Sequence, residues 1–405
     1  MIKRIPIGEL RIGMYVHDVN CSWRAAHLHR LRRKITGDAQ VETIRDLGVR
    51  EVYIDTALGD DLAGAPTEDE VRRQLETEIG FIAARGEAPM HHRLASPEEL
   101  ADALSVHDSA SGLVRELMTD VRLGRQLEFE SISETLRKVT DGVMDNFGTL
   151  LQLGQLKNAD DYTFQHSVGV CALLTAFGKG LELSRATLFD LGVGALLHDI
   201  GKMKVPTEIL NKPGALTKGE FEEMKQHVAF GRELVRDAPW VSPTALNVLE
   251  HHHERYDGTG YPHGLKGADI SHVGQMTAII DVYDALTAER VYHQAMSPAE
   301  ALRKLHEWSR FHFNEELVTH FIRNLGIYPV RTVVRMESGK VGIVVDQNPD
   351  ELLRPVVLVV CDMDAHRVPS PYRLDLRSEA ACDRIVAHEP AEKYRLDVDR
   401  CLAAA

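Results

Sequence analysis

The sequence lacks the features that define several large classes of protein. Its five cysteines are scattered with no CxxC spacing, which excludes a disulfide framework and a thiolate zinc site; they stand at positions 21, 171, 361, 382 and 401. No apolar run approaches the ~20 residues of a membrane-spanning helix. The first ten residues, MIKRIPIGEL, have no signal-peptide core. We therefore expect a cytoplasmic protein with no membrane partner.

An excess of positive charge is also missing. The 405 residues carry 47 Lys and Arg against 61 Asp and Glu, a formal net charge of −14. Proteins that bind DNA or RNA do so mainly by neutralising phosphates with basic side chains. The composition thus argues against a nucleic-acid polymer as partner. The informative residues are the 20 histidines, several of which stand beside aspartates.

The length predicts two or three domains, and the hydrophobic share of 44% is typical of a folded protein. Residues 1–60 combine strand-like stretches with a helix that stops at a glycine, which predicts a small α/β domain. Residues 61–128 are polar and weakly patterned, so we expect a linker with surface helices. We expect a mainly α fold, because the longest segment, residues 129–325, has helical patterns.

Residues 129–325 show helical patterns with almost no strand signal, which predicts an all-α domain. Helix starts are marked by a capping box at Thr217–Glu220 and by Ser242-Pro243. The connecting helix 131–156 is amphipathic and would either dock on this domain or pair with a second copy, so a homodimer is one alternative. In residues 326–405 three β-branched stretches, RTVVRM, KVGIVVDQ and PVVLVVCD, predict a small C-terminal β module with a polar tail.

A histidine and an aspartate close one of the most apolar segments of the helical domain. His198-Asp199 follows LFDLGVGALL, which predicts a buried helix. Burying both groups is costly unless they pair with each other or bind a cation. Taken alone, a hydrogen-bonded core pair and a metal site are equally good interpretations.

Other metal-ligating residue types stand on successive predicted helices of the same domain. Each alone would fit a core or surface position, but together they favour a metal centre; they are His166, His227, His252, His253 and Asp281, with Asp284 on the same helix face as Asp281. Without Asp284, the four histidines and Asp281 together with His198 and Asp199 make seven donors. Seven donors are too many for one tetrahedral ion and suit two ions that share Asp199. Imidazole and carboxylate donors are compatible with Fe, Mn, Zn, Co or Ni.

Two divalent ions ~4 Å apart form a hydrolytic device for phosphate esters, because they generate hydroxide near neutral pH and stabilise charge during in-line displacement. They also place positive charge in the pocket of an acidic protein. Lys202 would add a cation for a phosphate oxygen, with a solvent-exposed position as the alternative.

Several motifs in this region resemble those of HD-GYP domains, a branch of the HD phosphohydrolase superfamily. They are HDIGK at 198–202, MKQH at 224–227, HHERYDGTGYP at 252–262, DVYDAL at 281–286 and RVY at 290–292. The resemblance covers about residues 150–325. Residues 1–60, with LRIGMYV and DLGVREVYID, are similar to the uncharacterised domain that often precedes HD-GYP in bacteria.

The resemblance implies hydrolysis of cyclic di-GMP to pGpG and in some cases to GMP, with Fe or Mn favoured. It implies one metal held by His166, His198, Asp199 and Asp281, and a second held by Asp199, His227, His252 and His253. A metal-bridging hydroxide would attack phosphorus while Lys202 and Arg290 stabilise the phosphoryl oxygens. Gly260-Tyr261-Pro262 would contact substrate and dock a diguanylate cyclase domain. Asp284 is a candidate for a further substrate contact and for the general acid.

Three positions depart from the family pattern. Tyr162 stands where some members have a Glu that binds a third metal, which predicts a two-metal site. His293 replaces a common Lys or Arg, and His251 extends the histidine pair as a bystander. Two other functions stay open: an HD phosphohydrolase that acts on another nucleotide, and a cyclic di-GMP sensor with little turnover.

Overall fold

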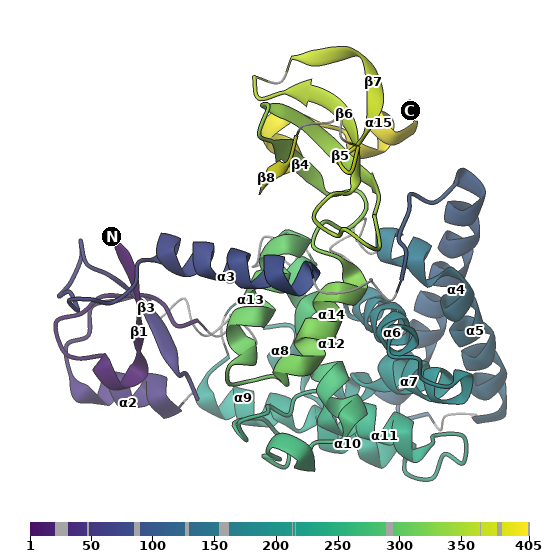
Figure 1. Cartoon of the computed structure of the whole chain (residues 1–405). Helices are drawn as coiled ribbons and strands as arrows, with labels where there is room; N and C mark the ends of the chain where they lie inside the picture. The colour runs from purple at the N-terminus through teal and green to yellow at the C-terminus, as the bar shows by residue number, and fades with distance from the viewer. Residues whose placement is uncertain are drawn as a thin grey trace.

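The chain is described by a computed structural model that covers residues 1–20, 31–46, 48–84, 90–125, 129–153, 162–212, 214, 216–288, 295–364, 366–378 and 383–403. A large helical domain carries a small N-terminal sheet on one side and a C-terminal sheet at one end (Figure 1). Among the helices described, none has both the length and the apolarity needed to cross a membrane.

The N-terminal domain is a three-stranded antiparallel sheet with a helix packed beside it. Its strands run in the order β1-β3-β2, with bounds β1 (Ile2–Pro6), β2 (Val16–Asp18) and β3 (Glu51–Asp55), and the helix is α2 (Asp38–Asp46). Its own apolar cluster includes Ile5, Met14, Ile44 and Ile54. The predicted order of strands, helix and strand is confirmed.

Two helices follow in the stretch that the sequence suggested to be a linker. Helix α3 (Glu68–Ala83) begins at a capping box formed by Thr67 and Glu70. It runs from the N-terminal domain along α13 (Pro298–Ser309) and α14 (Glu315–Leu325) (Figure 1). The second helix, α4 (Pro97–Arg122), is more than a surface helix, because Ala110, Val114 and Met118 lie in the largest apolar cluster of the molecule. Its weak pattern hid this burial, since small and polar residues separate the apolar ones.

The helical domain is built on successive helices joined by short connections. Their bounds are α5 (Phe129–Leu153), α6 (Tyr162–Gly180), α7 (Arg185–Leu197), η5 (Ile200–Lys204, a 3-10 helix), α8 (Thr207–Leu210), α9 (Lys218–Lys225), α10 (His227–Val235), α11 (Pro243–His251), α12 (His272–Thr287), α13 (Pro298–Ser309) and α14 (Glu315–Leu325). The predicted caps of α9 and α11 are confirmed. Helix α5 packs on α4, α6 and α7 within the chain, as expected for docking.

Helix α7 lies at the centre of this domain and contacts α5, α6 and α11. Two glycines allow such close packing. A Cβ at Gly192 would lie 2.6 Å from the Thr140 methyl group on α5, and one at Gly194 would lie 2.6 Å from Val248 on α11. The end of α7 is therefore fixed by its neighbours, which fixes the position of His198 and Asp199.

The C-terminal module is a five-stranded antiparallel sheet in the order β7-β6-β5-β4-β8. Its elements are β4 (Val333–Met336), β5 (Lys340–Asp346), β6 (Val356–Asp362), β7 (Arg367–Asp375), β8 (Ile385–His388) and α15 (Val398–Ala403). The three predicted strands are confirmed. Strands β7 and β8 were missed. Strand β7 carries two prolines among its first five residues, which is unusual in a strand, and the half-exposed side chains of β8 resemble the polar tail in which it lies.

Candidate metal centre

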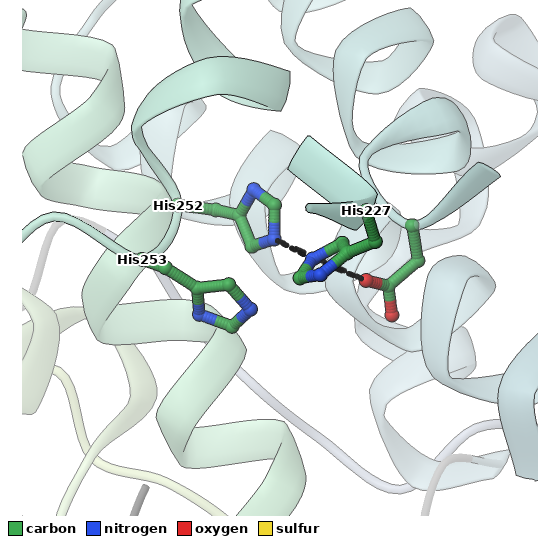
Figure 2. A group of neighbouring side chains, drawn as sticks. His227, His252 and His253 are labelled. Carbon is green, nitrogen blue, oxygen red and sulfur yellow. Dashed lines mark hydrogen bonds and ion pairs between the residues drawn. The ribbon is translucent and has the colours of Figure 1, made fainter. Parts of the chain in front are cut away.

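Seven predicted donor side chains meet in the interior of the helical domain. Helix α6 supplies His166, the end of α7 supplies His198 and Asp199, the first residue of α10 is His227, and α12 supplies Asp281. The end of α11 supplies His252 and His253, and Figure 2 shows both rings and His227 directed toward one space. The donor atoms form two groups that share a residue: His166, His198 and Asp199, and Asp199, His227, His252 and His253.

Three of these histidines are oriented in the same way. The Nδ1 atoms of His198, His227 and His252 lie 2.6, 2.7 and 2.7 Å from the carbonyl oxygens three residues earlier, at Ala195, Met224 and Leu249. A carbonyl accepts only, so each Nδ1 carries the proton and donates it. The Nε2 atoms are left as lone-pair donors that face the centre, the arrangement usual for metal-binding histidines.

The facing lone pairs need a positive charge between them. His227 Nε2 and His252 Nε2 are 3.3 Å apart, and both rings are buried. Burial lowers the pKa of His227 to about 4 and holds that of His252 well below its usual range, so both rings are neutral at pH 7. In addition, His198 Nε2 and Asp199 Oδ1 are buried without a hydrogen-bond partner in the described structure. These orphaned donors fit a divalent cation.

Asp199 faces both donor groups with different oxygens. Its Oδ2 lies 3.3 Å from His198 Nε2 and 3.8 Å from His166 Nε2, whereas Oδ1 lies 3.5 Å from His227 Nε2 and 3.9 Å from His252 Nε2. Burial alone would raise the pKa of Asp199, but the positive charge of Lys202 and the neighbouring His198 outweigh it and hold the pKa well below its usual range. The carboxylate is therefore ionised and placed to bridge two cations.

Asp281 closes the centre from α12. Its Oδ1 is 3.1 Å from His166 Nε2 and 4.0 Å from His198 Nε2, and its Oδ2 is 3.6 Å from His253 Nδ1. One turn later, Asp284 accepts a 2.7 Å hydrogen bond from His166 Nδ1. This bond favours an orienting role for Asp284 over proton donation to a leaving group, since its side chain is buried against the histidine.

Lys202 lies in η5 with its Nζ 2.5 Å from Asp199 Oδ2 and a quarter of its side chain exposed. Helix η5 can approach α10 closely because residue 201 is glycine: a Cβ there would lie 1.9 Å from the His227 carbonyl oxygen. The HDIGK sequence thus places a carboxylate, a cation and a close helix contact within five residues.

The signature loop (residues 254–265) follows the two histidines. Gly260 has no room for a side chain, because a Cβ would lie 2.4 Å from Arg255 N. The Tyr261 ring lies 4.7 Å from the His253 ring, and its amide donates to the His253 carbonyl at 3.2 Å. Pro262, joined by a cis peptide, is exposed at the surface. The loop therefore reaches from solvent to a donor of the centre.

Two acidic residues that organise this loop were not predicted. Glu254 is buried and accepts the amides of His263 and Leu265 at 2.8 and 3.0 Å. Asp257 accepts the Thr259 amide at 3.0 Å and its hydroxyl at 2.7 Å. The only sequence signal was their presence inside HHERYDGTGYP, because backbone amides cannot be assigned to a carboxylate without the turn itself.

Some predicted site residues cannot be placed. Arg290 and His293 lie outside the described residues, and so does the side chain of Tyr162, the first residue of α6. His251 lies apart from the donor groups and its Nδ1 is 2.9 Å from Ser271 Oγ, which agrees with its assignment as a bystander.

Fold and site together define an HD-type helical domain, and comparison with known families agrees. The HD domain profile matches residues 150–317, a domain of unknown function (DUF3391) matches residues 2–132, and a KOW domain associated with HD domains matches residues 333–390. The cyclic di-GMP phosphodiesterase PA4108 of Pseudomonas aeruginosa is 38% identical over 397 residues, 97% of this chain and 94% of that protein. The chain belongs to the HD-GYP family.

Other relatives match about two fifths of this chain. A cyclic di-GMP phosphodiesterase of Thermotoga maritima is 36% identical over 165 residues, 40% of this chain and 45% of that protein. The 3′3′-cGAMP-specific phosphodiesterase 1 of Vibrio cholerae is 38% identical over 167 residues, 40% of this chain and 38% of that protein.

Proposed function

We propose that this chain is a metal-dependent phosphodiesterase that hydrolyses cyclic di-GMP to pGpG, with GMP as a further product to be tested. The observation that carries the proposal is the pair of donor groups that share Asp199, with uncompensated lone pairs directed at one space. The relative that matches this chain over nearly its whole length bears the same activity in its name.

The proposed centre holds two divalent ions, with Fe or Mn as the first candidates. His166, His198, Asp199 and Asp281 would hold one ion, and Asp199, His227, His252 and His253 the other. Ions bound there would lower the pKa of a bound water and would stabilise negative charge on the phosphate group. The fixed tautomers of His198, His227 and His252 keep these donors directed inward without reorganisation on binding.

Groups at the rim would position the substrate. Among the described residues, the partly exposed ammonium of Lys202 is the cation that pairs with Asp199, and it would bind a non-bridging phosphate oxygen. Arg290 is proposed for the same task. The Tyr261 ring beside His253 would offer a stacking surface to a guanine base.

The test is product analysis on protein reconstituted anaerobically with Fe(II) and separately with Mn(II). Chromatography should show pGpG or GMP from cyclic di-GMP, and Asp199→Ala should abolish the product because the shared ligand is gone. Exposed Asp269→Ala on the same domain is the matched control. Normal turnover in Asp199→Ala with metals retained would refute the assignment. Metal analysis should give two ions per chain, and a ratio near three would refute the two-metal prediction.

A second substrate has a specific observation in its favour. A relative of similar identity is named for 3′3′-cGAMP. Parallel reactions with 3′3′-cGAMP and cyclic di-GMP compare the two directly, and a higher kcat/KM for 3′3′-cGAMP would replace the proposed substrate. Tight binding of cyclic di-GMP with two bound ions and no product would identify a sensor.

Two partner proposals belong to this function. A diguanylate cyclase domain would dock at Gly260-Tyr261-Pro262, of which Pro262 is exposed. A homodimer is the second proposal, and light scattering on the full chain tests it. Helix α5 packs against α4, α6 and α7, so any dimer would form through its outer side.

A further inference from the structure

The N-terminal domain contacts the signature loop directly. Arg50, just before β3, donates from Nε and Nη2 to Asp257 Oδ2, both at 3.3 Å. Gly48, two residues earlier, has a φ of +75°, and a Cβ there would lie 3.0 Å from Thr259 Cβ. The turn between α2 and β3 therefore fits closely over the loop, with one charged contact and one steric contact.

Asp257 joins this contact to the loop's own structure. Its Oδ1 shapes the turn by accepting from the Thr259 amide and hydroxyl, while its Oδ2 faces Arg50 and lies 3.6 Å from His312 Nδ1. Burial would raise the pKa of Asp257, but the nearby His312 ring and the hydrogen bonds from Thr259 outweigh it and keep the pKa low. The carboxylate is thus ionised when it meets the guanidinium.

The position of the N-terminal domain is set by a second, buried contact. Glu307 on α13 is 2% exposed and accepts from the Tyr53 hydroxyl at 2.6 Å and the Asn20 amide at 3.0 Å. Lys304 lies 3.1 Å from the same carboxylate, and Arg4 lies 3.6 Å away. A buried polar network of this kind specifies one docking geometry, since any shift leaves charged groups unpaired. Arg50 is held at the loop as a consequence.

The loop contacts the metal centre a few residues after Asp257. Asp257 and Thr259 precede Gly260 and Tyr261, and Tyr261 packs on the ring of His253. Glu254 closes the loop from inside through two backbone amides. The loop is therefore anchored from inside by Glu254 and from outside by Arg50.

We propose that Arg50 is a positioning residue for the reaction: through Asp257 it holds the signature loop so that Tyr261 stays packed on His253 at the substrate's edge of the centre. This gives the N-terminal domain a role in catalysis. Only the expected effect of Arg50 on KM rests on the proposed function; its effect on the loop does not. In the part of the chain that the structure describes, Arg50 contacts none of the donor side chains, so its loss should change substrate binding and leave metal binding intact.

The test compares Arg50→Ala with Arg45→Ala in the full-length protein. Arg45 is a matched control because it is on the same domain, is exposed to the same degree and pairs with Glu42 instead of the loop. Hydrogen exchange of the amides of residues 258–261 and 263–265 measures the loop without any substrate. Steady-state kinetics with cyclic di-GMP separate KM from kcat, and metal analysis monitors the centre.

Arg50→Ala should speed exchange in the loop and raise KM about two- to fivefold, the range that an exposed ion pair supports, with kcat and metal content unchanged. Arg50→Lys should recover part of the loss because it retains the charge. The Asp257→Ala single variant and the Asp257→Ala, Arg50→Ala double variant should have the same KM, because the single change already removes the contact between the two residues.

Unchanged exchange in Arg50→Ala would overturn the proposal, and so would faster exchange with an unchanged KM. If the wild-type protein hydrolyses no cyclic di-GMP, the proposed function fails. The exchange data then decide by themselves whether Arg50 holds the loop.

Discussion

At the scale of single residues, Asp284 shows how much of a metal centre lies behind its donors. It accepts from His166 Nδ1 and so directs Nε2 toward Asp199 and Asp281. Asp284→Ala should weaken metal binding about 10- to 100-fold, the usual effect of removing such a partner, while Asp284→Asn should lose less because an amide oxygen still accepts. Competition with a chromogenic chelator measures both, with Asp269→Asn as the exposed control. Equal affinity in wild type and Asp284→Ala would contradict this role.

Lys202 is the second residue whose role can be isolated. Lys202→Met removes the cation beside Asp199 and keeps the length of the side chain. We expect kcat/KM to fall about 10- to 150-fold, because hydrogen bonds to charged groups contribute roughly 1.5–3 kcal/mol. The neighbouring exposed Lys204→Met in the same turn should leave kcat/KM unchanged. Equal losses in the two variants would show a general charge effect and exclude a specific phosphate contact.

These residues also show what the sequence could predict. The seven donors were visible because histidine and aspartate in apolar helices are conspicuous, and the structure brings all seven together. The carbonyl groups that bind His198, His227 and His252 could not be predicted from the sequence. Every residue has a carbonyl, and only helix geometry selects the one three residues earlier. Asp257 was invisible as a link between domains, since its partner Arg50 is 207 residues away.

At the scale of elements, the contact between η5 and α10 decides whether the two donor groups share Asp199. Gly201→Ala would place a Cβ 1.9 Å from the His227 carbonyl, which forces the two elements apart. We expect a loss of about 1–3 kcal/mol in the free energy of unfolding, as for other overpacked sites, together with fewer bound ions. Urea unfolding and metal analysis measure the two effects.

The control for this variant is Gly219→Ala on α9, where an added Cβ meets nothing within 4 Å. Alanine favours helix over glycine, so this variant should be as stable as wild type or slightly more stable. A Gly201→Ala protein with wild-type stability and two bound ions would show that the two elements can separate without cost to the centre.

Helix α13 carries the carboxylate that docks the N-terminal domain, and this docking should depend on pH. Burial would raise the pKa of Glu307, but Lys304, Tyr53 and Arg4 outweigh it and lower the pKa below its ordinary value of 4.5. A depressed folded-state pKa means that the carboxylate contributes stability above pH 4.5 and loses it as the pH falls through the lowered value. Acidification should therefore weaken the contact between α13 and the N-terminal domain.

Glu307→Gln isolates this effect. At pH 7 it should lower the free energy of unfolding by about 1–3 kcal/mol, because charged hydrogen bonds in a buried site are lost. The difference from wild type should narrow as the pH falls from 4.5 through the lowered pKa, below which Glu307 of the wild type is itself protonated. Urea titrations at several pH values measure it, with exposed Glu233→Gln as control. A difference that stays constant with pH would exclude Glu307 as the titrating group.

Elements that depend on long-range contacts were the ones the sequence could not supply. The burial of α4 comes from α5 and α6, and β8 exists because Val334 and Arg335 of β4 pair with His388 and Ala387. Neither is encoded by a local period. By contrast, β5 and β6 have continuous β-branched runs that their burial on both faces requires, so their pattern alone was sufficient.

At the scale of the whole molecule, the C-terminal sheet is joined to the helical domain by more than a linker. The stretch before α4 pairs with β5: the Leu94 amide donates to the Val345 carbonyl at 2.7 Å, and the Gln347 amide donates to the His92 carbonyl at 2.9 Å. The Gln347 side chain also donates to the Leu325 and Tyr328 carbonyls, and Leu352 lies in the main apolar cluster. The module thus holds both the start of α4 and the end of α14.

A chain that ends at Pro329 should consequently be less stable in its helical domain and not simply shorter. The His92 and Leu325 carbonyls lose their donors and the place of Leu352 becomes empty, so we expect a loss of several kcal/mol. For a domain of about 200 residues each kcal/mol lowers Tm by roughly 2–4 °C, which makes the shift easy to measure by calorimetry. A chain that ends at Ala403 is the control. If both chains melt at the wild-type temperature, the sheet is an appended module, and its pairing with residues 92–94 contributes nothing to the stability of the centre.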